Sequence, residues 1–430
     1  MSTTTPTSAE PVPGPVSGSP GPVPDTAPVP PRRHGVRAAW IMMASGWSAN
    51  QFSALLGAYR SELGLSESAV TGLFALYVIG LIPGLLVGGP LADRVGRRPV
   101  ALTALALNLV STGVLMLGAG ATGWLWPGRF VTGFSAGALL AAGSAWIKEL
   151  SSAPHVPAGS GTASTASRRA GLFVSAGFAS GGLVAALIAR WAPAPMVTAY
   201  IPHALLAVGA GLLALKAPET VTPPTEGDRA GSGALTVPGA GGRGAGRLFR
   251  RRVLPVAPWV FAAPSVGFVT LPGLVHGGLV YAGVATAVVP GSGLLVQPLA
   301  RRVAPRHRLA TAVAGLLTVT VGFGAAAFAA SLGTGSGGLV LALVAAAILG
   351  AGYGFVLTYA LTEVTAMAPP HRLARLTAYF WTAAYVGMLA PYAVTLLSGV
   401  VRPPALLTGA AALAALSCAL LTALHARERS

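Results

Sequence analysis

Residues 88–100 of this 430-residue chain read GGPLADRVGRRPV, and they place one aspartate and three arginines within six consecutive positions. The stretch separates two long apolar runs in a chain that is only 9% charged and 53% hydrophobic. Soluble domains carry about 25% charged residues, so the charge here cannot cover the surface of a globule of this size. Lipid is therefore the solvent expected for most of the surface, with this charged stretch at the membrane's edge.

Twelve apolar runs follow one another along the chain, each close to the length of about 20 residues that a helix needs to cross a bilayer. The runs are continuous rather than alternating, which favours helices over barrel strands. The predicted fold is an all-α integral membrane protein with twelve transmembrane helices in two pseudo-symmetric six-helix halves. The predicted spans are 38–58, 69–91, 100–119, 124–147, 169–191, 197–216, 253–272, 277–300, 309–331, 338–362, 376–398 and 404–425.

Composition and charge divide the chain further. The predicted segments are a disordered, Pro-rich tail (1–36), a first half (37–216), a flexible linker (217–252), a second half (253–425) and a short tail (426–430). Of the 28 Lys and Arg residues, all but four fall on one side of the predicted membrane; the exceptions are Arg60, Arg129, Arg190 and Arg402. Because cytoplasmic loops are enriched in these residues, we expect a cell-membrane protein with both termini in the cytoplasm.

The two halves repeat each other at one position. GPLADRVGRR at 89–98 and QPLARRVAPR at 297–306 agree at six of ten positions, and each lies between the second and third spans of its half. This agreement predicts that the halves are duplicated six-helix units, an arrangement known in transporters.

The first of these loops resembles the cytoplasmic signature G-x-L-A-D-r-x-G-r-k of the major facilitator superfamily. The resemblance implies a carrier whose two halves open alternately to either side, with Asp93 locking them together on the cytoplasmic side. The alternative for the arginines is that they only follow the positive-inside rule. We expect Gly89 to permit close helix approach and Gly96 a tight turn. The candidate gating residues are Gly89, Asp93, Arg94, Gly96, Arg97, Arg98, Glu149 and Glu363.

Arg129 begins the pattern R-x-x-x-G-x-x-x-G in the fourth predicted span, with Gly133 and Gly137 on the same helix face. Charged residues inside a membrane are expensive and usually functional, and small residues on that face let another helix approach it. The pattern resembles that of proton-coupled members of the superfamily, so Arg129 is the candidate for proton coupling. The alternative is an arginine that extends to the outer surface.

The fifth predicted span contains Gly177, Gly181 and Gly182. The first two match the glycine spacing G-x-x-x-G-P-x-x-G-G of drug antiporters, but Gly182 replaces the proline and alanines replace the closing pair. These glycines form a predicted hinge, and simple helix packing explains them equally well.

Uncharged polar and aromatic residues are the candidates for the substrate cavity. Asn50 and Gln51 lie in the first span, and Tyr353, Trp381 and Tyr385 lie in the tenth and eleventh spans. Adjacent residues on a helix point about 100° apart, so only one of the first pair can face the cavity squarely. Interhelical hydrogen bonding and core packing are the alternatives.

The charged, cysteine and histidine residues exclude several classes of function. No carboxylate lies near the middle of a span, which leaves Asp93, Glu149, Glu363 and His203 as candidates to carry a proton. The single cysteine, the scattered histidines and the absence of G-x-x-x-x-G-K-[ST] argue against a metal centre, an enzyme or an ATP-driven pump, so we expect no cofactor. The net charge of +17 is spread between spans and does not predict nucleic-acid binding.

The sequence therefore predicts a monomeric carrier surrounded by lipid that moves a small molecule. Proton-driven export of a hydrophobic or amphipathic molecule is favoured by Arg129 and by a cavity rich in aromatic residues. The alternative is proton-coupled uptake or facilitated diffusion of a polar metabolite such as a sugar. Pro218-Glu219-Thr220, after the sixth span, resembles a sugar-porter loop ending, although proline alone would also stop the helix.

Overall fold

The computed structural model describes residues 33–152, 155, 163–221, 246–333, 335–367 and 373–427. Most of the predicted N-terminal tail, most of the linker and the last three residues lie outside this part of the chain. The first half contains α1 (His34–Ala54), α2 (Leu56–Leu63), α3 (Glu67–Val95), α4 (Arg97–Leu117), η1 (Thr122–Trp124), α5 (Leu125–Glu149), α6 (Ala163–Trp191), α7 (Pro195–Thr198) and α8 (Ile201–Ala214). The second half contains η2 (Phe249–Val253), α11 (Trp259–Ser265), η3 (Val266–Thr270), α12 (Leu271–Leu274), α13 (Gly278–Val303), α14 (Arg308–Leu332), α15 (Ser336–Met367), α16 (Leu373–Val386), η5 (Gly387–Leu389), α17 (Ala390–Leu397) and α18 (Pro403–Ala426).

The all-α membrane fold is confirmed. Within the described residues, 10 helices are long and apolar enough to cross a membrane, and they correspond to ten of the predicted spans. The first predicted span is divided between α1 and α2 at Leu55, and it is the span that carries Asn50 and Gln51. The seventh is divided into short α-helical pieces and the π-helical turns η2 and η3. Pro264 lies inside α11, two residues before η3 begins, and has no N–H to donate, which fits a break in the regular ladder there.

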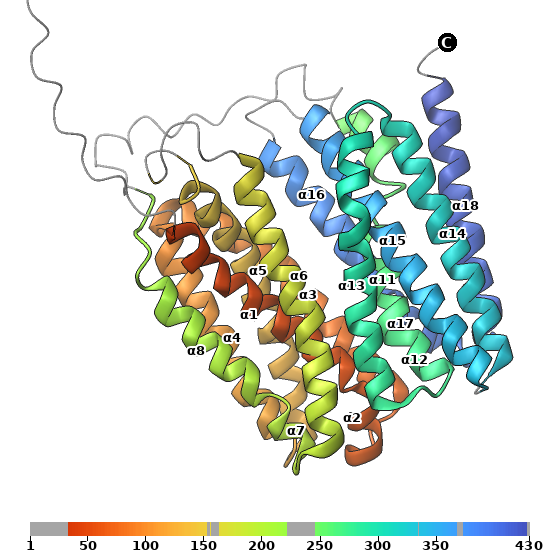
Figure 1. Cartoon of the computed structure of the whole chain (residues 1–430), viewed down its shortest axis with the longest axis horizontal. Coiled ribbons are helices and arrows are strands. Elements are labelled where there is room, and N and C mark those ends of the chain that lie inside the picture. The colour runs from red at the N-terminus through yellow and green to blue at the C-terminus, as the bar shows by residue number, and fades with distance from the viewer. Residues whose placement is uncertain are drawn as a thin grey trace, which may run out of the picture.

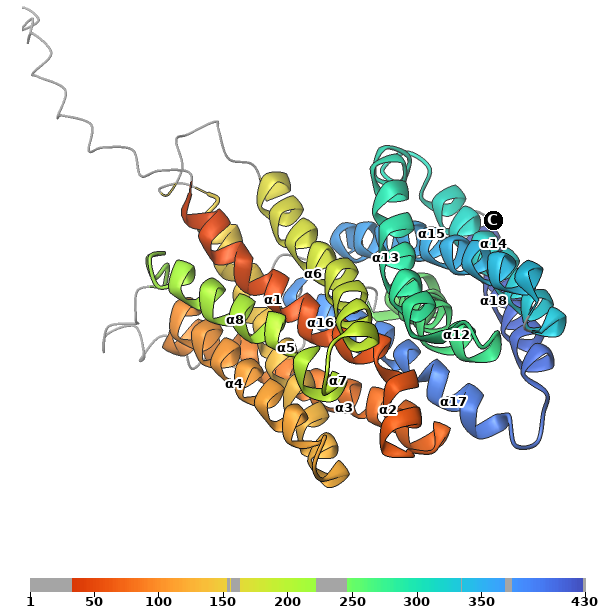
Figure 2. The same ribbon diagram turned by 60° about the horizontal axis from the view of Figure 1, so that its bottom comes forward.

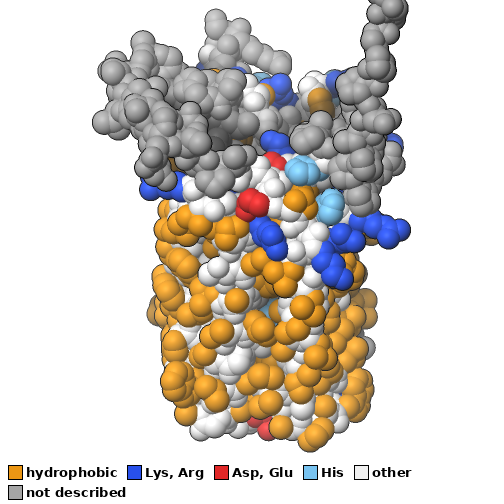
Figure 3. All heavy atoms as spheres, turned by 90° about the vertical axis from the view of Figure 1, so that its left-hand side faces the viewer, with side chains coloured by type: hydrophobic (Ala, Val, Ile, Leu, Met, Phe, Trp, Pro, Cys, Tyr) orange, Lys and Arg blue, Asp and Glu red, His pale blue; other side chains and the backbone are white. Residues whose placement is uncertain are grey.

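The helices form two bundles that lie side by side, with α1–α8 in one and α11–α18 in the other (Figure 1). We call the end where α1 begins and α18 ends the basic end, because Lys and Arg gather there and the rest of the visible face is mainly hydrophobic (Figure 3). In both ribbon views α6 and α13 approach each other at the opposite end and diverge toward the basic end (Figure 2).

Glycines bring α3 and α5 into backbone contact. A Cβ built on Gly84 would lie 2.0 Å from the carbonyl oxygen of Phe134, and one on Gly133 would lie 1.9 Å from that of Tyr77. The sequence prediction that Gly89 serves this purpose was wrong by one residue. A Cβ on Gly88 would lie 2.6 Å from the Cα of Ala138, whereas one on Gly89 would make only an ordinary contact of 3.9 Å.

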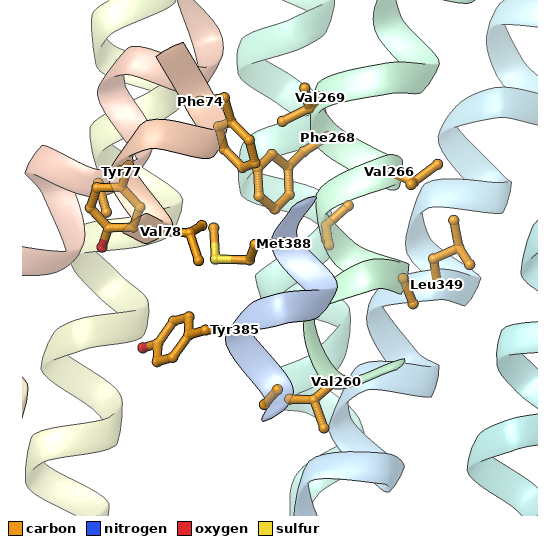
Figure 4. Packing of buried hydrophobic residues seen from close by; sticks show 14 of the residues in the cluster. Phe74, Tyr77, Val78, Val260, Val266, Phe268, Val269, Leu349, Tyr385 and Met388 are labelled. Carbon is orange, nitrogen blue, oxygen red and sulfur yellow. The ribbon is translucent and has the colours of Figure 1, made fainter. Parts of the chain in front are cut away.

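The two halves touch at the end opposite the basic end. Phe74 of α3 and Phe268 of η3 pack edge to face with ring centroids 6.3 Å apart. Figure 4 shows this pair beside Met388, with Tyr77 and Tyr385 nearby from opposite halves. These side chains are buried and belong to one continuous hydrophobic cluster, so this contact between the halves is apolar.

Candidate functional site

Charged residues of the signature loop form a network at the basic end of the first half. Arg97, the first residue of α4, contacts the carboxylate of Asp93 at 2.5 Å and that of Glu149 at 3.2 Å. The hydroxyl of Thr220 also donates to Glu149. Asp93 is 61% exposed and its ion pair stays within its own loop. The network therefore holds the loop, α5 and the segment after α8 together, and the role of Asp93 in joining the halves stays a prediction.

Glu219 occupies the N-terminus of α4. Its carboxylate accepts hydrogen bonds from the backbone N–H groups of Arg97 and Arg98, both at 2.9 Å, and from those of the two residues that follow it. Gly96 has a φ of 117°, and a Cβ there would lie 2.6 Å from this carboxylate, so the turn needs glycine. Burial acts to raise the pKa of Glu219, but the four backbone N–H groups outweigh it and hold the pKa below its usual value.

The other two arginines of the signature loop take different positions. Arg98 donates through Nη2 to the carbonyl oxygen of Leu215 at 2.8 Å, which adds a second link between α4 and the end of α8. Arg94 is exposed.

The second half repeats part of this arrangement. Glu363 lies near the end of α15 and is buried, with Arg308 at 3.7 Å and Arg252 at 3.5 Å. Arg308 is the first residue of α14, as Arg97 is the first residue of α4. In each half, the arginine at the start of the third span therefore pairs with a glutamate near the end of the fourth span, Glu149 or Glu363. This equivalence supports the predicted duplication of the two halves.

A central cavity lies between the halves and is lined by residues of both. Phe261 of α11 stacks on Tyr385 with ring centroids 4.6 Å apart, and on Tyr353 and Trp381 at 6.1 Å each. All four side chains line the cavity, as does Tyr77 from the first half. The structure therefore brings together the three predicted aromatic candidates. Sequence reasoning missed Phe261, although its place between Pro258 and Pro264 in a broken span was a usable signal.

Asn50 and Gln51 differ in position. Asn50 lines the cavity, and its amide nitrogen donates to the carbonyl oxygens of Phe178 at 2.7 Å and Thr286 at 3.2 Å. It thus links α1 to α6 and, across the two halves, to α13. Gln51 is fully buried, and within the described part of the chain neither polar atom of its amide has a hydrogen-bond partner.

Arg129 points into the first bundle rather than toward lipid. Its side chain is 0% exposed, and its guanidinium lies over the rings of Phe52 at 4.0 Å and Tyr77 at 4.9 Å. Its Nε donates to the carbonyl oxygen of Leu73 at 3.3 Å. Tyr77 contacts this guanidinium and also lines the central cavity.

The predicted hinge glycines have separate surroundings. A Cβ on Gly177 would lie 2.1 Å from the carbonyl oxygen of Met43, and one on Gly181 would lie 2.8 Å from the Cα of Trp47. These two glycines therefore pack α6 against α1 within one half. Gly182 faces the other half, where its Cβ would lie 2.1 Å from Oγ1 of Thr286. Gly137 packs against α3 as Gly133 does.

Comparison with known proteins identifies the family. A sequence profile described as Major Facilitator Superfamily matches residues 38–391, which is most of the chain.

Curated relatives match over a short region. The chain is 36% identical over 76 residues to "Multidrug resistance protein MdtL" of Klebsiella pneumoniae (strain 342), covering 18% of this chain and 19% of that protein. It is 35% identical over 77 residues to the protein of the same name from Escherichia coli O139:H28 (strain E24377A / ETEC), again covering 18% and 19%. The chain thus matches about a fifth of the length of these relatives.

Solved structures match over nearly the whole fold. A POT family transporter in complex with 5-aminolevulinic acid has a TM-score of 0.76 at 11% identity, covering 91% of this chain and 96% of the other. The POT family transporter PepTSo has a TM-score of 0.69 at 14% identity, covering 92% and 98%. At such low identity these likenesses establish the fold alone.

Proposed function

This chain belongs to the Major Facilitator Superfamily and is a secondary transporter, and from that premise we propose that it exports hydrophobic or amphipathic small molecules in exchange for protons. The observation that carries the proposal is the aromatic cavity formed by Phe261, Tyr353, Trp381 and Tyr385. Stacked aromatic rings favour flat, apolar ligands. The cavity offers few polar groups that could select one particular polar ligand.

The proposed direction of transport depends on which end of the protein faces the cytoplasm. By the positive-inside rule the basic end faces the cytoplasm. The halves touch at the opposite end through Phe74 and Phe268, and α6 and α13 diverge toward the basic end. In this conformation the cavity would load from the cytoplasm, as an exporter must. The partial likeness to a protein named for multidrug resistance supports the same direction.

Proton coupling is supported by the pattern around Arg129. The described residues that line the cavity include no Asp, Glu or His. The proton would therefore bind outside the cavity, with His203 and the carboxylates of the basic end as candidates. His203 is buried and hydrogen-bonded through Nδ1 to Thr112 at 2.8 Å. The same lining favours the second candidate function, facilitated diffusion without protons.

The test is efflux of a cationic aromatic dye from cells that express the chain, with and without a protonophore. We expect efflux that the protonophore abolishes and that Trp381→Ala weakens. Tyr379→Ala is the matched control, because Tyr379 lies two residues earlier on the same helix and is 52% exposed. Efflux insensitive to the protonophore would support facilitated diffusion. Absence of efflux of several such dyes, with the protein present in the membrane, would contradict export.

A further inference from the structure

Arg129 carries a charge that no acidic side chain of the described part of the chain balances. The ion pairs formed there involve Arg60, Arg97, Arg252 and Arg308, and none includes Arg129. Both terminal nitrogens, Nη1 and Nη2, are buried and have no hydrogen-bond partner among the described residues. Removing a charge from water is costly unless another charge and further hydrogen bonds compensate it, so this guanidinium lacks part of its expected surroundings.

The groups around Arg129 stabilise a cation only in part. The rings of Phe52 and Tyr77 contact the face of the guanidinium, and of the N–H groups in its plane only that of Nε has a hydrogen-bond acceptor among the described residues. The ring of Tyr59 packs against that of Phe52 with centroids 4.9 Å apart, and the hydroxyls of Tyr59 and Tyr200 hydrogen-bond to each other. That single bond uses one of the two hydroxyl protons, so one O–H remains able to donate. Gln51, the residue before Phe52, also has a buried amide to which no described residue hydrogen-bonds.

We propose that Arg129 is the base of an anion-binding site that takes a compact monovalent anion. Nη1 and Nη2 donate to the anion, and the hydroxyl pair of Tyr59 and Tyr200 supplies a further donor. A guanidinium fork with two free donor nitrogens matches a carboxylate or a halide. Two sources share this chemistry: free chloride, and the carboxylate of a transported molecule that enters past Tyr77 from the central cavity.

This inference goes beyond proton coupling and does not depend on the direction of transport. Binding is measured on the purified full-length chain, without transport. If anion binding fails and protonophore-sensitive efflux remains, the proposed function survives and the anion site does not.

The experiment measures saturable binding of radiolabelled chloride to the chain in lipid nanodiscs, with isethionate as the bulky counter-ion and ionic strength held constant. We expect binding that acetate displaces, that is lost in Arg129→Met and that is retained in Arg60→Gln. Arg60 is an exposed arginine paired with Glu67, so its replacement controls for the loss of one positive charge. Absence of saturable chloride binding in the natural protein, or equal binding in Arg129→Met, would overturn the proposal.

Two further variants guard against misfolding. Arg129→Lys keeps the charge but not the fork, and Tyr59→Phe removes one hydroxyl while keeping the ring. Both should weaken chloride binding, and unchanged affinity in both folded variants would overturn the site. Benzoate and benzamide then identify the source. Displacement of chloride by benzoate but not benzamide assigns the site to a carboxylate of the cargo, whereas chloride binding that neither displaces assigns it to the free ion.

Discussion

Asn50 of α1 and Thr286 of α13 are joined across the two halves by a hydrogen bond from the amide nitrogen to the carbonyl oxygen, 3.2 Å long. The same nitrogen donates to the carbonyl oxygen of Phe178 on α6 at 2.7 Å. One buried amide thus ties three helices together where the halves close. Because Asn50 also lines the cavity, a substrate that engages this amide would compete with the closure.

Closure at this point should depend on the absence of a side chain at residue 182. A Cβ on Gly182 would overlap Oγ1 and Cβ of Thr286, at 2.1 and 2.7 Å, and Thr286 is too short to move aside. Gly182→Val should therefore separate the halves at the end opposite the basic end. The measurement is the cross-linking yield between cysteines placed at Phe74 and Phe268, which should fall. Gly171→Val is the control on the same helix, because no atom that the structure describes lies within 4 Å of a Cβ built there. An equal yield in both variants would contradict the prediction.

Phe261 should contribute to substrate affinity more than any single ring that stacks on it, because it contacts Tyr353, Trp381 and Tyr385. Aromatic pairs contribute about 0.5–1.5 kcal/mol each beyond area burial. We expect Phe261→Ala to raise the KM for dye efflux by roughly tenfold with little change in maximal rate, which is the signature of lost ground-state binding. Phe328→Ala, at an exposed position, is the control. A fall in maximal rate with constant KM would instead assign Phe261 to the conformational change.

Asp93 should affect transport without affecting the stability of this conformation. The Asp93 side of its ion pair with Arg97 is exposed, and ion pairs open to water contribute about 0–1 kcal/mol. If Asp93 joins the halves when the basic end closes, Asp93→Asn should slow turnover and leave the unfolding temperature nearly unchanged. Glu67→Gln breaks a comparable exposed pair with Arg60 at the opposite end and should alter neither quantity. Normal turnover in Asp93→Asn would remove this residue from the gate.

The fold could be predicted because the membrane imposes a simple rule. Each apolar run of sufficient length must be a helix that satisfies its own backbone, so the spans follow from composition. Local breaks are set by packing and could not be predicted in the same way. Leu55 separates α1 from α2 without proline or glycine at that position, and η3 adopts π geometry beside Phe74 of the other half.

Parts of the site could be predicted where a short local pattern in the sequence is sufficient to identify a residue. A buried arginine with glycines at i+4 and i+8 is visible in sequence, and Arg129 lies inside the bundle. Roles that depend on a partner far along the chain were not visible. Glu219 binds the start of a helix 122 residues earlier, and Phe261 joins aromatic residues of two other spans. The choice between Gly88 and Gly89 depends on a helix rotation of about 100°.

Glu219 should stabilise the basic end of the first half in a manner that depends on pH. Its carboxylate accepts the N–H groups of Arg97 and Arg98, and losing such a helix cap costs about 1 kcal/mol. Because the pKa of Glu219 is lower in the folded chain than its usual value of 4.5, the stabilisation is complete above about that pH and is lost as the pH falls through the folded value. Glu219→Gln should therefore unfold at a lower temperature than the natural chain at pH 7, and the difference should shrink in acid. Glu62→Gln, at an exposed carboxylate of the opposite end, should show no such difference. A constant difference between Glu219→Gln and the natural chain from pH 7 to below 4 would show that the charge of this cap contributes nothing.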